Sequence, residues 1–240
     1  MNLIINGAGG KMGKIVSSMA EANGENIVGR ADVAEGYSRL EDIDVKADCL
    51  IDFSNHKAAL GVLNYCEKKN LPVLIASTGH DENELKLIHE ASKKIPVFLS
   101  SNMSLGVALL ADVAERVAKV FGDCDIELIE AHHNQKLDVP SGTALTLAKR
   151  LQEAREDLTF NIGRHENGKR PKNEIGIHSL RYGSEVGIHE IIFSNGLETI
   201  TLRHDAKDRA LFAKGALAAV KWLVKQNAGL YNMRDFLAGE

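Results

Sequence analysis

Two adjacent histidines, a lysine and a Ser-Gly-Thr sequence lie close together in EAHHNQKLDVPSGTAL, residues 130–145. Histidine and lysine can both exchange protons near neutral pH when their surroundings adjust their pKa values. Ser141 is a typical helix N-cap, and Gly142 with Thr143 would form a first helical turn whose free N–H groups attract a carboxylate or phosphate. The segment therefore combines proton donors with an anion-binding helix start.

The spacing in this segment disfavours a metal site. His132 and His133 are adjacent, so on a strand they point to opposite faces, and no HExxH motif or cysteine pair accompanies them. An isolated His-His pair would be interpreted as structural, with Lys136 as a solvated charge and Ser141 as a simple cap. A hydride reduction would use the whole segment, because the atom beside the reduced carbon needs a proton that His132 or Lys136 could supply.

The segment GAGGKMG, residues 7–13, gives a second chemical signal between an expected strand and an expected helix. Gly7 can supply a tight turn, Gly10 lets the backbone approach a pyrophosphate, and Gly13 lets the helix pack close to the sheet. Asp32, at the end of the next expected strand, can accept hydrogen bonds from an adenosine ribose. The GxxGxxG spacing is less common than GxGxxG, but its context predicts dinucleotide binding rather than a glycine-rich turn without a ligand.

The residues near this loop leave the choice between NADH and NADPH open. Asp32 favours a free ribose 2′-hydroxyl, whereas a 2′-phosphate would need a neighbouring cation such as Arg30 or Lys11. Either cation could equally be a solvated surface charge. Two further loops, 76–79 and 100–103, follow expected strands at the same edge of the sheet and could contact the nicotinamide half.

Alternating apolar runs and helical patterns would position the glycine loop. Strands are expected at 3–6, 27–32, 48–53, 72–77 and 96–101, and helices at 14–22, 56–69 and 82–93. The strand segments are apolar throughout, which is typical of parallel strands buried on both faces. They predict an α/β fold with a Rossmann-like doubly wound parallel sheet and right-handed crossovers.

The second half of the chain has a different pattern. The expected elements are a helix over 104–120 capped by Ser104, a strand over 124–133, a helix from Ser141 to about Ala154, an irregular segment at 157–173, strands at 175–183, 186–193 and 197–204, and a helix over about 209–225. A hairpin turn is expected at Ser194-Asn195-Gly196. This region predicts a mostly antiparallel sheet with one or two helices.

Composition disfavours several other classes of protein. The 240 residues are 44% hydrophobic and 26% charged, as in a soluble protein with a buried core, and the net charge of −4 argues against general nucleic-acid binding. No apolar run approaches the roughly 20 residues of a membrane helix, and MNLIINGAGG does not resemble a signal peptide. Three scattered cysteines fit neither a metal site nor a simple disulfide framework, which predicts a reducing cytoplasm.

With these motifs in place, the sequence resembles the 4-hydroxy-tetrahydrodipicolinate reductase (dihydrodipicolinate reductase) family over nearly its full length. The segments that carry the resemblance are GAGGKMG (7–13), DFS (52–54), STG (77–79), SSNMSLGV (100–107), EAHHNQKLDVPSGTA (130–144), IGIHSLRYG (175–183) and FAKGA (212–216). Residues 130–144 are the most specific of them. Family members often have Arg-Gly-Gly where this chain has Arg-Tyr-Gly at 181–183, and Gly-Glu-His where it has Gly-Ile-His at 187–189.

The resemblance implies a role for each matching position. His132 would be the catalytic histidine and Lys136 the proton-donating lysine. The implied substrate contacts are His133, Gly142 and Thr143. The implied cofactor contacts come from three loops and one acid: Gly7, Ala8, Gly9, Gly10, Lys11, Met12, Asp32, Ala76, Ser77, Thr78, Ser100, Ser101, Asn102 and Met103.

The resemblance also implies an architecture and a reaction. A dinucleotide-binding domain would comprise 1–103 with 212–240, and a mixed α/β substrate-binding and tetramerisation domain 104–211. NADH or NADPH would reduce the small cyclic dicarboxylate 4-hydroxy-tetrahydrodipicolinate to tetrahydrodipicolinate in lysine and diaminopimelate biosynthesis. A cytoplasmic homotetramer without a metal, nucleic-acid or membrane partner is expected. Two alternatives remain: another Rossmann dehydrogenase acting on an amino-acid semialdehyde or imino acid, and a non-catalytic nucleotide sensor.

Overall fold

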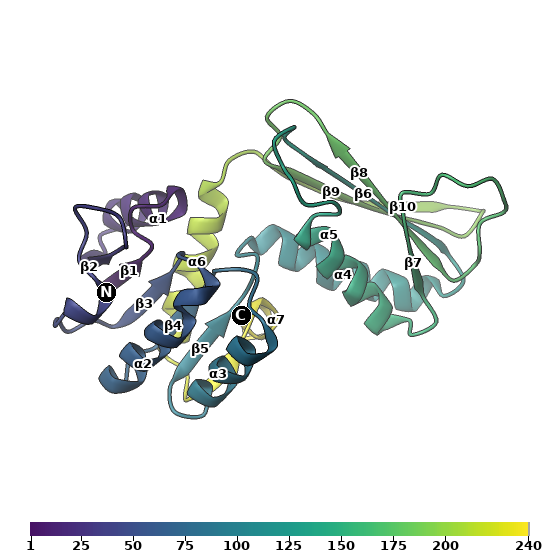
Figure 1. The fold of residues 1–240 in the computed structure, drawn as a ribbon. Helices are drawn as coiled ribbons and strands as arrows, with labels where there is room; N and C mark the ends of the chain where they lie inside the picture. Colours follow the sequence, from purple (N-terminus) through teal and green to yellow (C-terminus); the bar gives the residue numbers. More distant parts are fainter. Residues whose placement is uncertain (240) are drawn as a thin grey trace. The chain divides into compact units, whose positions relative to one another are not determined.

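The computed structural model describes residues 1–239 and divides into two compact units (Figure 1). The first unit comprises Met1–Leu105 together with the chain from Ala210 onward, and the second comprises Gly106–Arg209. The first unit is therefore discontinuous in sequence, because the chain leaves it after Leu105 and returns at Ala210.

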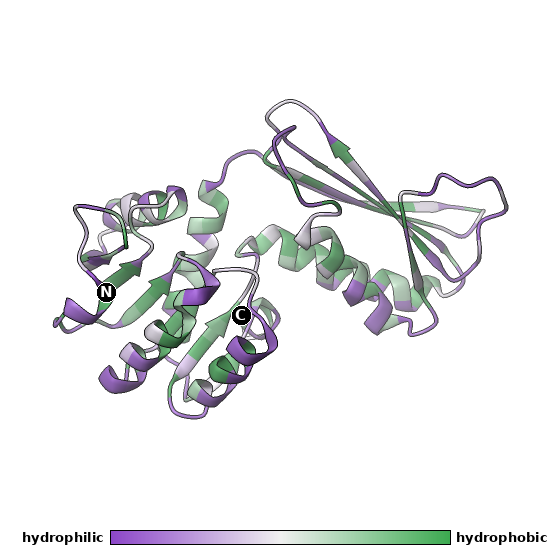
Figure 2. Cartoon of the chain, viewed as in Figure 1, coloured by the Kyte–Doolittle hydropathy of each residue, from purple (hydrophilic) through white to green (hydrophobic). Residues whose placement is uncertain are grey.

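The first unit contains a six-stranded sheet in which every neighbouring pair of strands is parallel. In spatial order the strands are β11 (Gly229–Tyr231), β5 (Pro96–Leu99), β4 (Val73–Ile75), β3 (Cys49–Asp52), β1 (Asn2–Asn6) and β2 (Asn26–Ala31). Leu3, Ile4, Leu50 and Ile51 are fully buried, and these strands are mostly hydrophobic in Figure 2. The predicted Rossmann-like parallel sheet is confirmed, and the edge strand β11 is an addition to it.

Helices cover both faces of this sheet. They are α1 (Lys11–Ala22), η1 (Leu40–Asp42), η2 (His56–Ala58), α2 (Ala59–Lys69), α3 (Glu82–Ser92), α6 (Ala210–Leu223) and α7 (Met233–Ala238). Val62 of α2 and Ile88 of α3 pack against one face of the sheet, whereas Trp222 of α6 meets Phe98 edge-on at the other. A Cβ at Gly215 would lie 1.7 Å from the Met103 carbonyl oxygen, so only glycine lets α6 lie this close to that backbone.

The second unit contains a mixed five-stranded sheet. In spatial order its strands are β10 (Thr199–Ala206), β9 (Gly187–Ser194), β6 (Asp125–His132), β8 (Glu174–Arg181) and β7 (Thr159–Ile162). The pairs β6–β8 and β7–β8 are parallel, whereas β6–β9 and β9–β10 are antiparallel. The prediction of a mostly antiparallel sheet is therefore wrong. Alternating hydrophobicity reports which side chains are buried and not the direction of the neighbouring strand.

Two helices pack on one face of this second sheet. They are α4 (Leu105–Phe121) and α5 (Gly142–Ala154). Leu110 of α4 and Leu147 of α5 share a core with Ile126, Ile177 and Phe193 of the sheet. Strand β7 lies within the segment that the sequence predicted to be irregular, because its four residues are too few and too polar to show a pattern.

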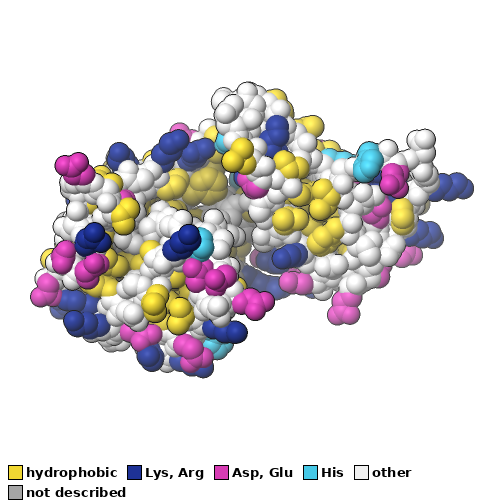
Figure 3. Space-filling view, in the orientation of Figure 1, with side chains coloured by type: hydrophobic (Ala, Val, Ile, Leu, Met, Phe, Trp, Pro, Cys, Tyr) yellow, Lys and Arg dark blue, Asp and Glu magenta, His cyan; other side chains and the backbone are white. Residues whose placement is uncertain are grey.

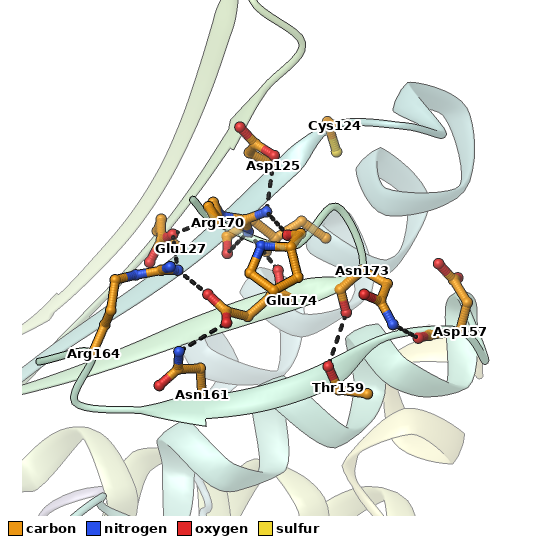
Figure 4. Close-up of polar contacts among 12 residues, drawn as sticks. Cys124, Asp125, Glu127, Asp157, Thr159, Asn161, Arg164, Arg170, Asn173 and Glu174 are labelled. Carbon is orange, nitrogen blue, oxygen red and sulfur yellow. Dashed lines mark hydrogen bonds and ion pairs between the residues drawn. The ribbon is translucent and has the colours of Figure 1, made fainter. Parts of the chain in front are cut away.

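A polar cluster fixes the end of the second sheet where this unpredicted strand joins it (Figure 4). The Arg170 guanidinium donates to Glu127 Oε1 at 3.0 Å and to Asp125 Oδ1 at 2.8 Å. Glu174 is ion-paired with Arg164 and accepts a hydrogen bond from Asn161 Nδ2 at 2.8 Å. Both arginines lie in the loop between β7 and β8, so the cluster holds that loop against β6 and β8.

Charges of both signs are mixed on the face of the molecule that Figure 3 shows. In the face shown in Figure 3, acidic and basic side chains are interspersed, and neither sign forms an extended patch. Over residues 1–239, no helix is both long enough and apolar enough to cross a membrane.

Candidate active site

His132 is the last residue of β6, and a buried carboxylate holds its imidazole ring. The Nδ1 atom of His132 lies 2.6 Å from Oε2 of Glu130, two residues earlier on the same face of the strand. The Glu130 side chain is fully buried, and that of His132 is 10% exposed. The opposite nitrogen, Nε2, lies 3.1 Å from the position that a Cβ at Gly187 would occupy. A glycine at 187 therefore leaves space beside the Nε2 atom.

Glu130 accepts hydrogen bonds from three elements of the second unit. Arg181 at the end of β8 donates through Nη1 to Oε2 at 2.9 Å and through Nη2 to Oε1 at 2.8 Å. The backbone N–H of Ser141 donates to Oε1 at 3.1 Å. Burial by itself would raise the pKa of Glu130, but the hydrogen bonds from His132, Arg181 and the Ser141 N–H outweigh burial and hold the pKa well below its ordinary value.

A second histidine, His189 on β9, lies on the other side of the His132 ring. The two rings meet edge to face with centroids 5.3 Å apart. His189 Nε2 lies 3.2 Å from Ser141 Oγ, which also accepts from the Ala144 N–H as the N-cap of α5. Burial lowers the pKa of His189 to about 3, and the charges of His132 and Lys136 act in the same direction. His189 is therefore neutral at physiological pH.

Lys136 and the start of α5 share one carboxylate. The Lys136 Nζ atom lies 2.8 Å from Asp138 Oδ1. Burial raises the pKa of Asp138, but the hydrogen bond from Lys136 and a weaker one from the Gly142 N–H lower it overall. A Cβ at Gly142 would meet no described atom within 4 Å, so this helix start is open. An ammonium group beside an open helix N-terminus thus already binds a carboxylate group.

Most of the site residues that the sequence predicts in this unit lie at or just after the end of β6 or at the start of α5. His133 follows β6 directly, and its N–H donates to the Glu185 carbonyl at 2.9 Å. Gly142 and Thr143 form the first turn of α5, as predicted for the Ser141 cap. Within the described chain, no group of three or more His, Cys, Asp or Glu side chains is placed to hold a metal ion.

In the first unit, the glycine loop is shaped by close backbone contacts. Gly7 has a φ of +77°, and a Cβ there would lie 2.7 Å from the Phe53 carbonyl oxygen. A Cβ at Gly13 would lie 2.0 Å from the Gly7 carbonyl oxygen. The helix α1 begins at Lys11, with Gly10 as an N-cap that offers no side-chain cap. Both glycines are therefore required by the loop itself, and the helix N–H groups are left for a ligand.

A cavity of about 1070 Å³ opens beside this loop. Its wall includes Gly7, Gly9, Gly10 and Asp32 of the predicted cofactor residues, and also Arg39. Asp32 accepts from the Gly9 N–H at 2.8 Å through Oδ2 and from the Ala34 N–H at 2.9 Å through Oδ1. The acid is thus held against the glycine loop at the rim of a space large enough for a nucleotide.

The two cations that the sequence predicts as possible partners of a 2′-phosphate do not line this cavity. Arg30 is paired with Glu21 at 2.5 Å, and neither Arg30 nor Lys11 lines the cavity. The basic residues of the cavity wall are Arg39, Lys57 and Lys68. Sequence reasoning missed Arg39 because it lies beyond the end of β2, in a loop whose course no periodic pattern predicts.

The remaining predicted cofactor loops are partly turned inward. Ser77 is buried, and its hydroxyl donates to Asp52 Oδ2 at 2.9 Å. Asp52 is 1% exposed, also accepts from Asn6 Nδ2 at 2.7 Å, and has no ion-pair partner within residues 1–239. The Met103 side chain is buried too. The other predicted residues on the loops that follow β4 and β5 are more accessible. Three are half-buried (Ala76, Ser100 and Asn102) and two are exposed (Thr78 and Ser101).

The chain matches sequence profiles of one family along almost all of its length. The profile described as dihydrodipicolinate reductase, N-terminus, matches residues 1–103, and the one described as dihydrodipicolinate reductase, C-terminus, matches residues 106–237. The chain belongs to the dihydrodipicolinate reductase family. That assignment confirms the resemblance inferred from the glycine loop and from residues 130–144.

Named relatives and a solved structure agree with this family. A 4-hydroxy-tetrahydrodipicolinate reductase of Caldanaerobacter subterraneus subsp. tengcongensis is 43% identical, covering 99% of this chain and 98% of the relative. One of Clostridium novyi is 42% identical, covering 98% and 97%. The dipicolinate-bound dihydrodipicolinate reductase from Paenisporosarcina sp. TG-14 has a TM-score of 0.79 at 24% identity, covers 97% of each chain, and shows that the fold is shared.

Burial of His189 in this reductase predicts acid lability. Its pKa is about 3 in the folded chain against an ordinary 6.5, so between these pH values the unfolded chain binds a proton that the folded chain does not. The free energy of unfolding should therefore fall as the pH drops from 6.5, by up to about 1.4 kcal/mol per pH unit. Urea unfolding of His189→Gln between about pH 4.5 and 6.5 should show a shallower dependence than the parent. The exposed His165→Gln should match the parent, and equal slopes for all three proteins would refute the prediction.

Proposed function

We propose that this chain, an NAD(P)H-dependent oxidoreductase by family membership, reduces 4-hydroxy-tetrahydrodipicolinate to tetrahydrodipicolinate in diaminopimelate and lysine biosynthesis. The first unit binds the dinucleotide and the second holds the cyclic dicarboxylate. The observation that carries the proposal is the cluster of His132, Lys136 and the start of α5. It offers proton-exchanging groups beside a site that already binds a carboxylate.

The residues of the second unit have distinct proposed tasks. Lys136 and His132 manage the proton that must reach the atom next to the reduced carbon. The N–H groups of Gly142 and Thr143, with His133 beside them, bind a substrate carboxylate. Asp138 is ion-paired with Lys136, so a substrate carboxylate would have to share or replace this contact. Bound NADH or NADPH supplies the hydride.

The loops of the first unit are proposed to hold the cofactor. The N–H groups of Lys11 and Met12 in the first turn of α1 would bind the pyrophosphate, because those of Gly9 and Gly10 donate to Asp32 and to the Gly7 carbonyl. Asp32 would also accept from the ribose hydroxyls. Exposed positions of the 76–78 and 100–103 loops would contact the nicotinamide half. Ser77 and Met103 would act through their backbone, because their side chains are turned into the protein.

An oxidation assay with both cofactors tests the function. The substrate is generated enzymatically in the cuvette, and loss of NADH or NADPH absorbance is followed. Turnover with this substrate, and none with amino-acid semialdehydes or acyclic imino acids, is the expected result. Turnover of those other substrates alone would support the alternative dehydrogenase, and cofactor binding without any turnover would support the nucleotide sensor.

Arg39 is the proposed determinant of NADPH use. A guanidinium at the cavity wall beside Asp32 can form charge-assisted bonds with a 2′-phosphate. Arg39→Ala should raise the KM for NADPH by about tenfold or more, the value of one lost charged hydrogen bond, and leave the KM for NADH nearly unchanged. Arg30→Ala, which removes a cation paired with Glu21, is the matched control. Equal changes in both KM values would place Arg39 away from the 2′ position.

The proposals for assembly and location start from an open face of the second sheet and from the free cysteines. The face of the second sheet away from α4 and α5 carries partly exposed Ile129 and Ile192 and a Leu180 side chain that is 49% exposed. Apolar residues on an open sheet face suit an interface between copies of the chain. We propose a homotetramer in the cytoplasm, where the three free cysteines would stay reduced. No nucleic-acid or membrane partner is proposed.

A further inference from the structure

We infer that Glu130 is a positioning residue for His132: it fixes the proton on Nδ1 and thereby makes Nε2 the nitrogen that exchanges a proton with substrate. Arg181 and the Ser141 N–H hold the Glu130 carboxylate in place for this task. The inference rests on the proposed acid–base role of His132, and it assigns the tautomer and the reacting atom, which that role leaves open.

The groups around Glu130 are all hydrogen-bond donors. Arg181 has only N–H donors, and it occupies one site on each carboxylate oxygen. The Ser141 N–H, also a donor, occupies a second site on Oε1. A carboxylate surrounded in this way is an acceptor, so the 2.6 Å contact with His132 requires the proton to be on Nδ1. The low pKa of Glu130 agrees with this assignment.

The two ring nitrogens of His132 differ in the space around them. The Nδ1 atom faces a fully buried carboxylate and has no access to a substrate. The Nε2 atom instead faces the start of β9 at Gly187, where the absence of a side chain leaves room. Neutral His189 packs against the ring from another side and restricts its rotation. Of the two ring nitrogens of His132, only Nε2 is therefore placed to exchange a proton with a substrate.

The charges around His132 also suit this assignment. Arg181 balances the buried charge of Glu130 when His132 is neutral, so the carboxylate can remain ionised throughout. When Nε2 takes a proton, the imidazolium gains an ion pair with Glu130. Lys136 and neutral His189 add no further negative charge around the ring. A buried acid of this kind orients an imidazole and stabilises its protonated form without itself receiving the proton.

Nuclear magnetic resonance tests the tautomer directly, apart from any activity. Two-bond ¹⁵N–¹H correlation spectra of the labelled chain should show His132 with the proton on Nδ1 at about pH 8, and His132→Asn assigns its signals. In Glu130→Gln the carboxamide can donate as well as accept, so the Nδ1–H form should no longer be the only tautomer. An Nε2–H tautomer of His132 in the parent chain would overturn the inference, whatever the kinetics show.

Kinetics supply the second test. Glu130→Gln should lower kcat by about 10²-fold or more, as in other enzymes whose catalytic histidine loses the acid that orients it. The Kd for NADPH, measured by fluorescence titration, should not change. Glu174→Gln is the matched control, because Glu174 is also a buried, arginine-paired acid of the same sheet (Figure 4) and should keep parental kcat. If Glu130→Gln does not fold, Glu130→Asp keeps the charge, moves the oxygens away from Nδ1, and should lose kcat likewise.

The outcomes separate this inference from the proposed function. Parental kcat in a folded Glu130 variant would overturn the positioning role. Parental kcat in His132→Asn would instead remove the proposed acid–base role of His132, and with it the proton exchange that the inference assigns to Nε2. The spectra of the parent chain would still show whether Glu130 fixes the proton on Nδ1.

Discussion

Replacing Lys136 with methionine should lower kcat by about 10²- to 10⁴-fold, the usual contribution of a positioned proton donor. Its side chain is 22% exposed, and its ammonium lies 2.8 Å from Asp138 in the loop before α5, close to where the proposed substrate carboxylate binds. Methionine keeps the length of the aliphatic chain but cannot donate a proton or attract an anion. The KM for the dicarboxylate should rise as well, whereas the Kd for NADPH should not change.

A matched lysine isolates this effect from the loss of a charge. Lys149 is exposed on α5, the same helix whose first turn lies beside Lys136, and Lys149→Met should keep parental kcat and KM. Pre-steady-state measurement of cofactor oxidation would show whether the chemical step has slowed. A Lys136→Met enzyme with parental kcat and a raised KM would mean that the lysine binds the substrate and donates no proton.

His132 provides an internal test of the same assignment. If His132 and Lys136 act on one proton, their losses should not add, and the double variant His132→Asn/Lys136→Met should be little slower than the more damaging single variant. Additive losses would show that the two residues act at separate steps. The comparison requires the concentration of active enzyme in each preparation, because each kcat is a rate per active enzyme molecule.

The parallel sheet could be predicted because its strands are apolar on both faces and are separated by helices. Leu3 to Ile5 and Leu50 with Ile51 are buried whichever way they point, and that leaves a continuous signal in the sequence. The short elements gave no comparable signal. Strand β11 has three residues and α7 has six, too few for either period to repeat. The strands of the second sheet could be predicted, but their relative directions were predicted wrongly, because the direction of a strand depends on how the chain connects it to its neighbours.

The site was predictable where its residues are neighbours in sequence. The Ser141 cap and the His132–Lys136 segment could be identified, and Glu130 could have been, since residues two apart on a strand share a face. Arg181 and His189 could not, because they reach Glu130 and His132 only through register. Strand β8 places Arg181 opposite His132, and β9 places His189 opposite Glu130. No local pattern specifies that pairing.

Asp52 shows the same limit in the first unit. In the sequence, the DFS segment contributes only to the family resemblance. In the structure, its acid accepts hydrogen bonds from Asn6, Ser54 and Ser77 at the ends of three adjacent strands. Those contacts explain why the Ser77 hydroxyl is turned inward. A single buried acid thus fixes the loops that are proposed to surround the cofactor, and only the order of β4, β3 and β1 in the sheet brings them together.

Gly13→Ala should produce the largest loss of cofactor affinity. The new methyl group would lie 2.0 Å from the Gly7 carbonyl oxygen and 2.8 Å from Ala8 Cα, both backbone atoms that cannot move aside alone. Either α1 shifts away from the loop or the Gly7 turn opens, and in both cases the N–H groups that would bind a pyrophosphate lose their common direction. The Kd for NADH and NADPH should rise by at least about 100-fold, as when two charge-assisted hydrogen bonds are lost.

Stability and binding can be measured on the same samples. Overpacking of this kind should also lower the free energy of unfolding by about 1–3 kcal/mol, visible as a lower urea midpoint. Ser18→Ala, at an exposed position of α1, is the control for a change in this helix and should alter neither quantity. Because Gly13 lies in the first unit and the proton-exchanging cluster in the second, the His132 tautomer should be unchanged in Gly13→Ala. A folded Gly13→Ala protein with parental Kd values would show that the loop is not the pyrophosphate site.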